Sequence, residues 1–340
     1  MRVKREVLLA ACQSVSPGLA ARETSELSTC LVFLADGRLV AFNQEICASC
    51  KSPIPVVGAV KAKPLLDLLA KLPDELLEVD EHDGHLRIKG KTGRRSGLRL
   101  EQDASIPIEV VGVPEEWLPI EGDFSEAVQA VVKCASRDSD DDFCWTCVHL
   151  HPDYIEATDR TQIGRYSIQM GTEEELLVRA EVLQKVVGYG VTEISAGKAW
   201  VHFRNPAGLV LSVRRFLDDY GDLTQYLDVK VVEPIVLPGS LTEVLKIIEI
   251  FSSNNAEGNF VTVDLREGRM LLEGRGAFGY AQEPVQVAYT GRPIKFRLSP
   301  GLLKQIIQRS NDCGLSDGKL VINSGEFRYV VSLIVEKAKG

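Results

Sequence analysis

Two short amphipathic helix patterns occur three times in this sequence, at nearly constant spacing. The first pattern begins at Glu6, Glu126 and Glu243, with offsets of 120 and 117 residues. The second is centred on Leu66, Leu183 and Leu303, with offsets of 117 and 120 residues. Because two separate landmarks keep the same register, we infer three copies of one unit. A period this long indicates repeated domains, since solenoid units span roughly 20 to 50 residues.

The third copy, residues 240–334, displays the unit most clearly. Apolar residues recur at helical spacing in 243–248, and a hairpin pattern follows, with strands at 260–263 and 269–272 joined through Glu267 and Gly268. The cycle then repeats, with a helix at 302–307 and strands at 319–322 and 327–333. Each unit is therefore expected to contain two helices packed on antiparallel sheets, which is an α+β fold.

The other copies fit the same plan, and proline-rich linkers separate them. The first copy has strand patterns at 31–34, 39–42, 76–79, 86–89 and 98–100. Prolines at 107, 114 and 119 mark the first boundary, and the second falls at 231–238. We predict domains at 1–118, 119–231 and 232–340. The length of 340 residues gives each of three domains enough chain for its own core.

Charge and hydropathy limit the environment of the protein. The net charge of −9 argues against a surface that is basic throughout, although a basic stripe on an acidic body is compatible with it. No apolar run approaches the length of a transmembrane span. The first residues lack a convincing cleavage site, so 1–12 are interpreted as a strand and a helix rather than a signal peptide. We expect a cytoplasmic protein.

The eight cysteines include two pairs with metal-ligand spacing, Cys47 with Cys50 and Cys144 with Cys147. The pairs lie in different repeats and lack glycine-rich knuckles. Cys144 and Cys147 also fall in a β-rich run, 143–148, where side chains three apart point to opposite faces. Buried, reduced thiols are the preferred interpretation, with a zinc or thiol-redox protein as the alternative.

Catalytic motifs are missing from the sequence. It contains no P-loop, no G-x-S-x-G elbow and no H-E-x-x-H pair. His149 and His151 would share one face of a strand, but no third ligand is signalled nearby, so a surface histidine pair is expected. We therefore predict a non-enzymatic protein without catalytic residues, cofactor or metal.

The run 157–163, Ala-Thr-Asp-Arg-Thr-Gln-Ile, resembles the Ala-Thr-Asp-Gly-His-Arg-Leu run of the bacterial DNA sliding clamp, the β subunit of the replicative polymerase. Further stretches agree with that family in order along the whole chain: 15–18 with 22–24, 216–220 with 226–227, and 329–334. Three segments depart from it. Arg160-Thr161-Gln162 replaces Gly-His-Arg, Gly221-Asp222 replaces Pro-Asp, and 332–335 replaces the terminal Met-Pro-Met-Arg. The sequence thus resembles a divergent member.

The resemblance implies a head-to-tail homodimer whose six domains close a ring around duplex DNA and tether a polymerase. It implies double-stranded DNA as a sequence-independent partner, and the polymerase and clamp loader as partners that dock through short peptides. A β-rich protein-interaction scaffold without DNA encirclement is the alternative. The interface residues implied are Leu98, Leu100, Ile250 and Phe251. The implied peptide pocket comprises Thr158, Ile163, Tyr226, Leu227, Val331, Leu333 and Ile334.

The candidate DNA contacts are Arg22, in the segment after the first helix, and basic residues on or beside the polar helix faces: Lys133, Arg137, Arg179, Lys185, Lys246, Lys304 and Arg309. Lys133 and Arg137 are four residues apart and are expected to share a helix face. Non-specific phosphate contacts give dissociation constants of only about 10⁻⁴ to 10⁻⁶ M at physiological salt. A closed ring makes such weak contacts sufficient, because release then requires opening an interface or leaving a DNA end.

Overall fold

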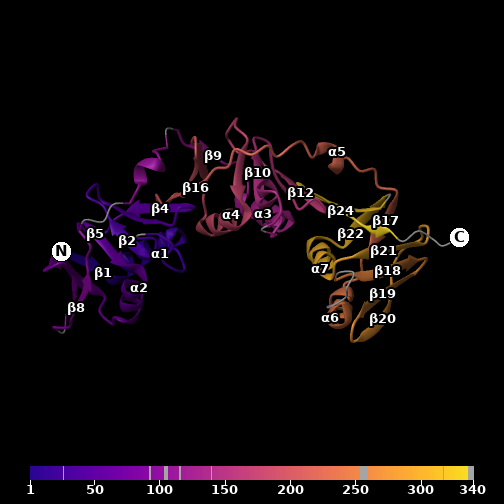
Figure 1. Cartoon of the computed structure of the whole chain (residues 1–340), viewed down its shortest axis with the longest axis horizontal. Coiled ribbons are helices and arrows are strands. Elements are labelled where there is room, and N and C mark those ends of the chain that lie inside the picture. The colour runs from indigo at the N-terminus through magenta and orange to yellow at the C-terminus, as the bar shows by residue number, and fades with distance from the viewer. Residues whose placement is uncertain are drawn as a thin grey trace. The chain divides into compact units, whose positions relative to one another are not determined.

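The computed structural model describes residues 1–25, 27–91, 93–102, 106–114, 116–138, 140–252, 259–316 and 318–335 (Figure 1). Contacts between Cα atoms divide the chain into two compact units. The first unit comprises Met1–Ala157 with Ser167–Tyr220, and the second comprises Thr158–Tyr166 with Gly221–Gly340. This division into two units does not test the boundaries of the three predicted domains, which stay a prediction.

The six predicted helices are all present. They are α1 (Arg5–Ser14), α2 (Ala62–Lys71), α3 (Phe124–Val131), α4 (Ala180–Val186), α6 (Leu241–Ser252) and α7 (Pro300–Arg309). They pack in pairs, α1 with α2, α3 with α4, and α6 with α7. Apolar residues at helical spacing face the core, as Leu65 and Leu69 do on α2 and Leu245 and Ile248 do on α6. The predicted α+β class with antiparallel sheets is confirmed.

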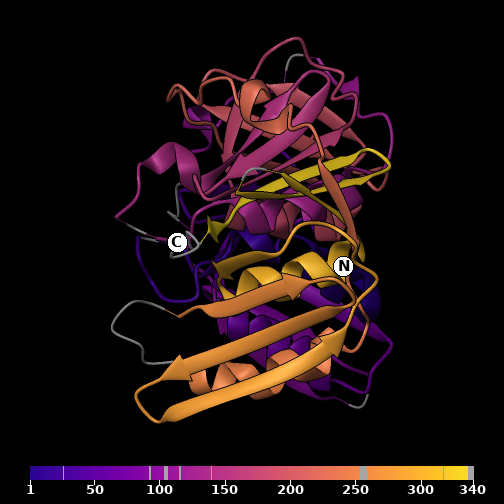
Figure 2. The same ribbon diagram turned by 90° about the vertical axis from the view of Figure 1, so that its right-hand side faces the viewer.

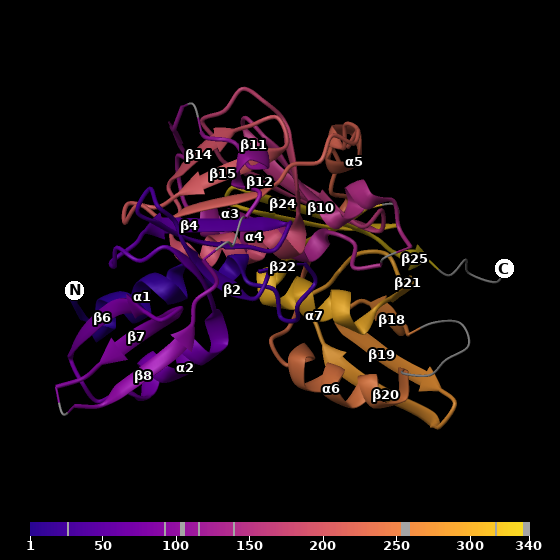
Figure 3. The ribbon, with the colours of Figure 1, turned by 60° about the vertical axis from the view of Figure 1, so that its left-hand side comes forward.

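The first unit contains a four-stranded sheet in the order β1-β6-β7-β8 (Figure 3). Its strands are β1 (Arg2–Lys4), β6 (Leu76–His82), β7 (His85–Lys89) and β8 (Arg95–Arg99). All neighbouring strands are antiparallel. The inward residues Val3, Leu77 and Ile88 are buried, whereas the alternate residues face outward, which leaves one face of this sheet open to solvent.

An eight-stranded antiparallel sheet continues from the first repeat into the second, within the first unit. Its order is β5 (Gly58–Lys61), β2 (Cys30–Phe33), β3 (Arg38–Phe42), β4 (Ile46–Lys51), β16 (Val210–Arg214), β15 (Trp200–Arg204), β14 (Glu193–Ala196) and β9 (Leu118–Pro119). The two repeats meet where β4 pairs with β16, with Ile46 opposite Val213. A further group, in the order β13-β10-β11, contains β13 (Leu176–Arg179), β10 (Cys147–His151) and β11 (Tyr154–Thr158).

The second unit contains two five-stranded groups and a one-turn helix, α5 (Thr224–Leu227). The first group is β12 (Gln162–Ser167), β24 (Phe327–Ser332), β23 (Lys319–Ser324), β22 (Asp312–Ser316) and β17 (Glu233–Val236). The second is β20 (Gly279–Gln286), β19 (Arg269–Gly276), β18 (Val261–Arg266), β21 (Ile294–Leu298) and β25 (Ile334–Val335). Helix α6 packs against β19 and β20, the long orange strands of Figure 2.

The β-rich interpretation of 143–148 is wrong for its first four residues. Residues Phe143–Thr146 form a 3₁₀ helix, and β10 begins only at Cys147. The Trp145 amide donates to the Asp142 carbonyl at 3.0 Å, and the Thr146 hydroxyl donates to the Phe143 carbonyl at 2.7 Å. These local bonds satisfy the backbone without a neighbouring strand. None of the helices described is long and apolar enough to cross a membrane.

Candidate binding surfaces

The run 157–163 forms a tight turn between β11 and β12, held by side-chain hydrogen bonds. The Thr158 hydroxyl donates to the Gln162 carbonyl at 2.7 Å and accepts from the Arg160 amide at 2.9 Å. Asp159 Oδ1 accepts from the amides of Thr161 and Gln162, each at 2.9 Å. Arg160 has a φ of 69°, in the left-handed region that favours glycine. Arg160 therefore adopts a conformation that favours glycine at the position where the run that it resembles has glycine.

An apolar cluster lies beside this turn, in the second unit. Leu227, Val321 and Val330 are buried together, with Ile163 and Val229 packed against them. Ile163 stands directly opposite Val330 across the β12–β24 pair. Tyr226, next to Leu227 on α5, is 49% exposed. We call Ile163, Leu227, Val229, Val321 and Val330 the α5 cluster.

Polar contacts fix the start of helix α5 and join it to strand β12. Asp222 Oδ1 accepts from the Thr224 amide at 2.8 Å, and hydrogen bonding to Thr224 lowers the pKa of Asp222. Arg165 of β12 donates to the Thr224 hydroxyl at 3.2 Å. The short helix therefore presents Tyr226 and Leu227 in a defined position beside Ile163.

The structure brings together some of the predicted pocket residues and separates others. Ile163 and Leu227 share the α5 cluster, with Tyr226 adjacent. Val331 pairs with Gln162, one register position away from Ile163 and Val330, so its side chain points to the opposite face of the sheet. Leu333 is buried, and its amide donates to the Gly318 carbonyl at 2.7 Å. Ile334 belongs to β25 and pairs with Arg297.

Sequence reasoning missed Val330, Val321 and Val229 in the α5 cluster. Strand alternation could have identified Val330 as an apolar residue on an otherwise polar face, because it shares that face with the exposed Arg328 and Ser332. Val321 could have been found from its register opposite Val330, but that pairing becomes known only with the fold. Nothing in the local sequence marks Val229.

The predicted DNA-contacting residues differ in their surroundings. Arg22, Lys133, Arg137, Lys185 and Lys246 are exposed. Lys246 Nζ lies 2.7 Å from Glu243 Oε1 on the same helix, and Lys304 is paired with Glu249. Arg179 donates to Glu45 at 2.7 Å and lies 5.2 Å from the centre of the Phe143 ring. The exposed Lys63 and Lys71 of α2 were missed, although both follow the polar face of a predicted helix.

Two of these residues need a correction. Lys133 and Arg137 do not share a helix face, because α3 ends at Val131 and continues only as a 3₁₀ turn over Val132–Cys134. Ala135 is extended, with a ψ of 148°, so Arg137 lies beyond the helical segment.

Arg309 packs over two aromatic rings instead of pointing freely from its helix. Its guanidinium carbon lies 4.9 Å from the centre of the Phe327 ring and 4.6 Å from that of Tyr329. Such stacking holds the cation over strand β24. The contact could not be foreseen, because it joins residues of two elements that are separated in the sequence.

The residues predicted for a dimer interface lie near two sheet ends. In the first unit, β8 ends its sheet, with Leu98 half-buried on it and Leu100 buried just beyond it. In the second unit, β20 ends its sheet, and Ile250 on the adjacent α6 is 64% exposed. Phe251 lies beside Gly279, where a Cβ would be 3.6 Å from its ring.

Two further aromatic side chains near that edge were missed. Phe278, in the turn before β20, is 80% exposed, and Tyr280 on β20 is 62% exposed. Exposed aromatics beside a terminal strand are typical of a surface that receives a partner.

The expectation of a surface histidine pair is wrong for His149, which is 4% exposed. Its Nδ1 lies 3.0 Å from Glu156 Oε1, and its Nε2 lies 3.1 Å from Glu175 Oε2. His151 is partly exposed and stacks on Tyr154 at 4.0 Å between ring centres. Pairing with carboxylates offsets the cost of burying the polar imidazole. The burial could not be predicted, because the sequence does not reveal Glu175 as a partner.

One cysteine of each pair, Cys47 and Cys147, is buried, whereas Cys50 and Cys144 are partly exposed. Burial raises the pKa of the Cys47 thiol and of the Cys147 thiol to about 12. No cluster of three or more histidine, cysteine, aspartate or glutamate side chains suited to a metal ion is found among the described residues.

The fold defined by these elements is that of the DNA polymerase III β sliding clamps, which confirms the resemblance at the level of the fold. The structure matches the DNA polymerase III subunit β of Pseudomonas aeruginosa with a TM-score of 0.82 and 17% identity, over 98% of this chain and 99% of that one. It matches the β subunit of Thermotoga maritima with a TM-score of 0.80 and 17% identity, over 99% of both chains.

The corresponding protein of Streptococcus pneumoniae gives a TM-score of 0.81 and 14% identity, over 98% of each chain. No family model matches the sequence, and no curated protein matches it. The similarity therefore lies in the fold.

Proposed function

We propose that this protein is a DNA sliding clamp: a homodimer that closes a ring around duplex DNA and tethers a replicative polymerase without catalysing a reaction or using a cofactor. The observation that carries the proposal is the extent of the fold similarity, which covers 98% of this chain and 99% of a sliding clamp at a TM-score of 0.83. A likeness of fold that reaches from end to end supports one common task for the whole chain.

The two sheet ends support dimer formation. A terminal strand presents unpaired backbone groups that can pair with another chain. In our proposal, β8 of one protomer meets β20 of the other. Ile250, Phe278 and Tyr280 are large apolar groups exposed near β20, and burying them would contribute roughly 1.5 to 3 kcal/mol for each fully covered side chain.

The exposed basic residues support loose contact with DNA. Lys63, Lys185 and Lys246 extend from α2, α4 and α6, one helix of each pair. Lys246 pairs with Glu243, but its side chain is still 60% exposed. Such contacts involve phosphates and carry no base information, so a ring that uses them can slide. Arg179, Lys304 and Arg309 are engaged with Glu45, Glu249 and aromatic rings, so we assign them a smaller part.

The α5 cluster supports a site for partner peptides. It is an apolar cluster whose members Ile163 and Val229 are partly exposed, with the exposed Tyr226 at its side. A hydrogen-bonded turn and a fixed one-turn helix position it. A few buried anchors from an extended peptide of the polymerase or of the clamp loader could supply most of the affinity there.

The mass in solution tests the proposal. Analytical ultracentrifugation at micromolar concentration should give a particle of two 37.4 kDa chains. A monomer at that concentration would contradict a ring of two protomers. A dimer that survives charge substitutions at Ile250 and Phe251 would instead mean that the chains associate through other surfaces.

A further inference from the structure

The solvent face of the sheet β1-β6-β7-β8 carries a concentration of basic side chains. Arg2 pairs in register with Glu78, Glu78 with Lys89, and Lys89 with Arg95, so these four side chains form one row across the sheet. Lys4, Arg87 and Arg99 occupy outward positions of neighbouring rows. Strands lie about 4.8 Å apart, so a row across four strands spans roughly 14 Å.

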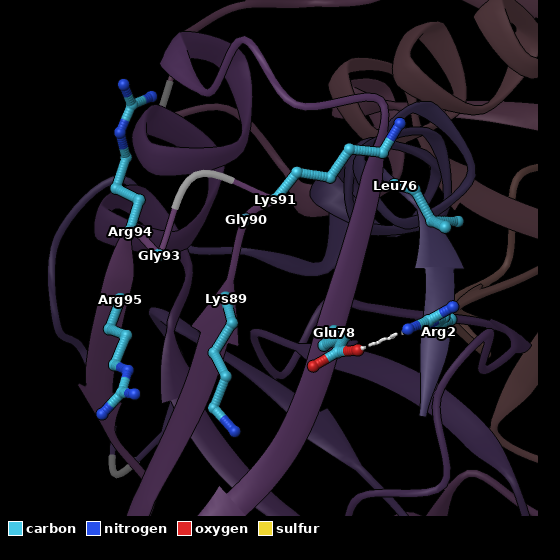
Figure 4. A pocket seen from close by; sticks show the side chains of 9 residues that line it. All are labelled: Arg2, Leu76, Glu78, Lys89, Gly90, Lys91, Gly93, Arg94 and Arg95. Atoms are coloured by element: carbon cyan, nitrogen blue, oxygen red, sulfur yellow. Dashed lines mark hydrogen bonds and ion pairs between the residues drawn. The ribbon is translucent and has the colours of Figure 1, made fainter.

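A cavity of about 390 Å³ opens at the end of this face, beside Gly90, Lys91 and Arg94. Its lining includes Arg2, Lys89, Lys91, Arg94 and Arg95, with Glu78 as the acidic member. Figure 4 shows Lys89 and Arg95 lying side by side on neighbouring strands, and Arg2 paired with Glu78. We call this lining and its row the β7–β8 basic surface. It belongs to a chain whose net charge is −9, so it is a local reversal of sign.

The turn that carries part of this surface is fixed from below by Asp74, a buried carboxylate. Asp74 Oδ1 accepts from the Lys91 amide at 3.0 Å, and Asp74 Oδ2 lies 3.9 Å from Arg94 Nη1. Gly90 is required at this contact, since a Cβ there would lie 2.4 Å from Asp74 Oδ2. The basic groups are thus presented by an anchored turn.

Two of the basic side chains that line the cavity, Lys91 and Arg95, are available to a ligand. Lys89 Nζ lies 3.4 Å from Asp80 Oδ2, and Arg2 is bound to Glu78. Lys91 and Arg95, in contrast, have no carboxylate within ion-pair distance among the described residues. Placing such cations together is electrostatically unfavourable unless an anion joins them.

We propose that the β7–β8 basic surface binds the phosphodiester backbone of DNA through charge alone. The site lies on the outward face of a sheet and is separate from the helices proposed to face duplex DNA. Of the described residues that line the cavity, none is aromatic, so the usual stacking platform for bases is lacking. Recognition therefore depends on phosphate charge and is independent of sequence.

Binding to a closed single-stranded DNA circle tests the proposal. A ring cannot thread onto such a circle without opening, so contacts outside the hole dominate the signal. Fluorescence anisotropy of a labelled circle is measured over a series of salt concentrations. Each phosphate contact on single strands contributes about 0.7 to the slope of log K against log salt. The double variant K91Q/R95Q should lower that slope by about 1.4, and R95Q alone by about 0.7.

A matched control removes two exposed lysines elsewhere, as K198Q/K230Q, and should leave the slope at the wild-type value. An unchanged slope in K91Q/R95Q, or an equal fall in the control, would overturn the proposal. So would full displacement of the circle by inorganic phosphate at the same total phosphate concentration, since a strand must outcompete isolated anions. The dimer mass of K91Q, whose residue lies outside β8, should equal that of the wild type, which separates failure here from failure of the clamp proposal.

Discussion

His202 should make the first unit lose stability as the pH falls below neutrality. The residue is buried on β15, between Ser195 of β14 and Ser212 of β16, and its Nδ1 lies 2.7 Å from the Ser212 hydroxyl. Burial lowers the pKa of His202 from 6.5 to about 4. The neutral ring is thus the form that the folded sheet accommodates.

The sign and size of the effect follow from the two pKa values. Between pH 6.5 and 4 the unfolded chain binds a proton that the folded chain excludes, so stability is fully present above pH 6.5 and is lost as the pH falls toward 4. Integration gives a loss of about 2 kcal/mol at pH 5 and about 3 kcal/mol at pH 4.

Denaturant unfolding followed by tryptophan fluorescence measures this loss. Trp117, Trp145 and Trp200 all lie in the first unit, so the signal reports on that unit. Between pH 7.5 and pH 5, H202Q should lose about 2 kcal/mol less than the wild type. The control H85Q, at an exposed histidine of the same unit, should behave like the wild type. Identical pH dependence in H202Q and the wild type would refute the reasoning.

Three predictions concern the proposed function. The double variant I250D/F251D should raise the dimer dissociation constant by at least about 100-fold in sedimentation, because charge is unfavourable in an interface core, while V7D, at an exposed position on α1, should not. I163D should lower the affinity for a fluorescent cognate clamp-binding peptide more than about 10-fold without changing the dimer mass, while I163V should still bind the peptide. Wild-type affinity in I163D would place the peptide site elsewhere. Neutralising three exposed basic residues, Arg22, Lys133 and Arg137, should lower the slope of log K against log salt for linear duplex DNA by about 2.7. An unchanged slope would remove these residues from the DNA path.

Helix positions could be predicted from the sequence because they depend on local periodicity. The recurrence of Leu66, Leu183 and Leu303 located the second helix of each repeat, and all three lie in helices of the structure. The strands followed from β-rich runs bounded by turns such as Glu267-Gly268. Both patterns extend over about a dozen residues, so they can be recognised without knowledge of the tertiary fold.

Side-chain partners could not be predicted in the same way. The position of Arg309 over Phe327 and Tyr329, and the burial of His149 against Glu156 and Glu175, depend on segments that meet only after folding. The candidate peptide site shows the same limit, because its location followed from the resemblance while its membership depended on strand register.

The β7–β8 basic surface illustrates a related limit. Arg2 and Arg95 are far apart in the sequence, and only the pairing of β1, β6, β7 and β8 places them in one row. Net charge reported an acidic chain and gave no sign of this local reversal.

Retention on circular DNA tests the central claim most directly. The protein is loaded onto a nicked circular duplex with a clamp loader, and bound protein is separated from free protein by gel filtration at a salt concentration that abolishes ordinary phosphate contacts. A ring that encircles DNA should stay on the circle and leave it when a restriction enzyme linearises the DNA. Loss from the intact circle at that salt, or equal retention before and after linearisation, would contradict encirclement.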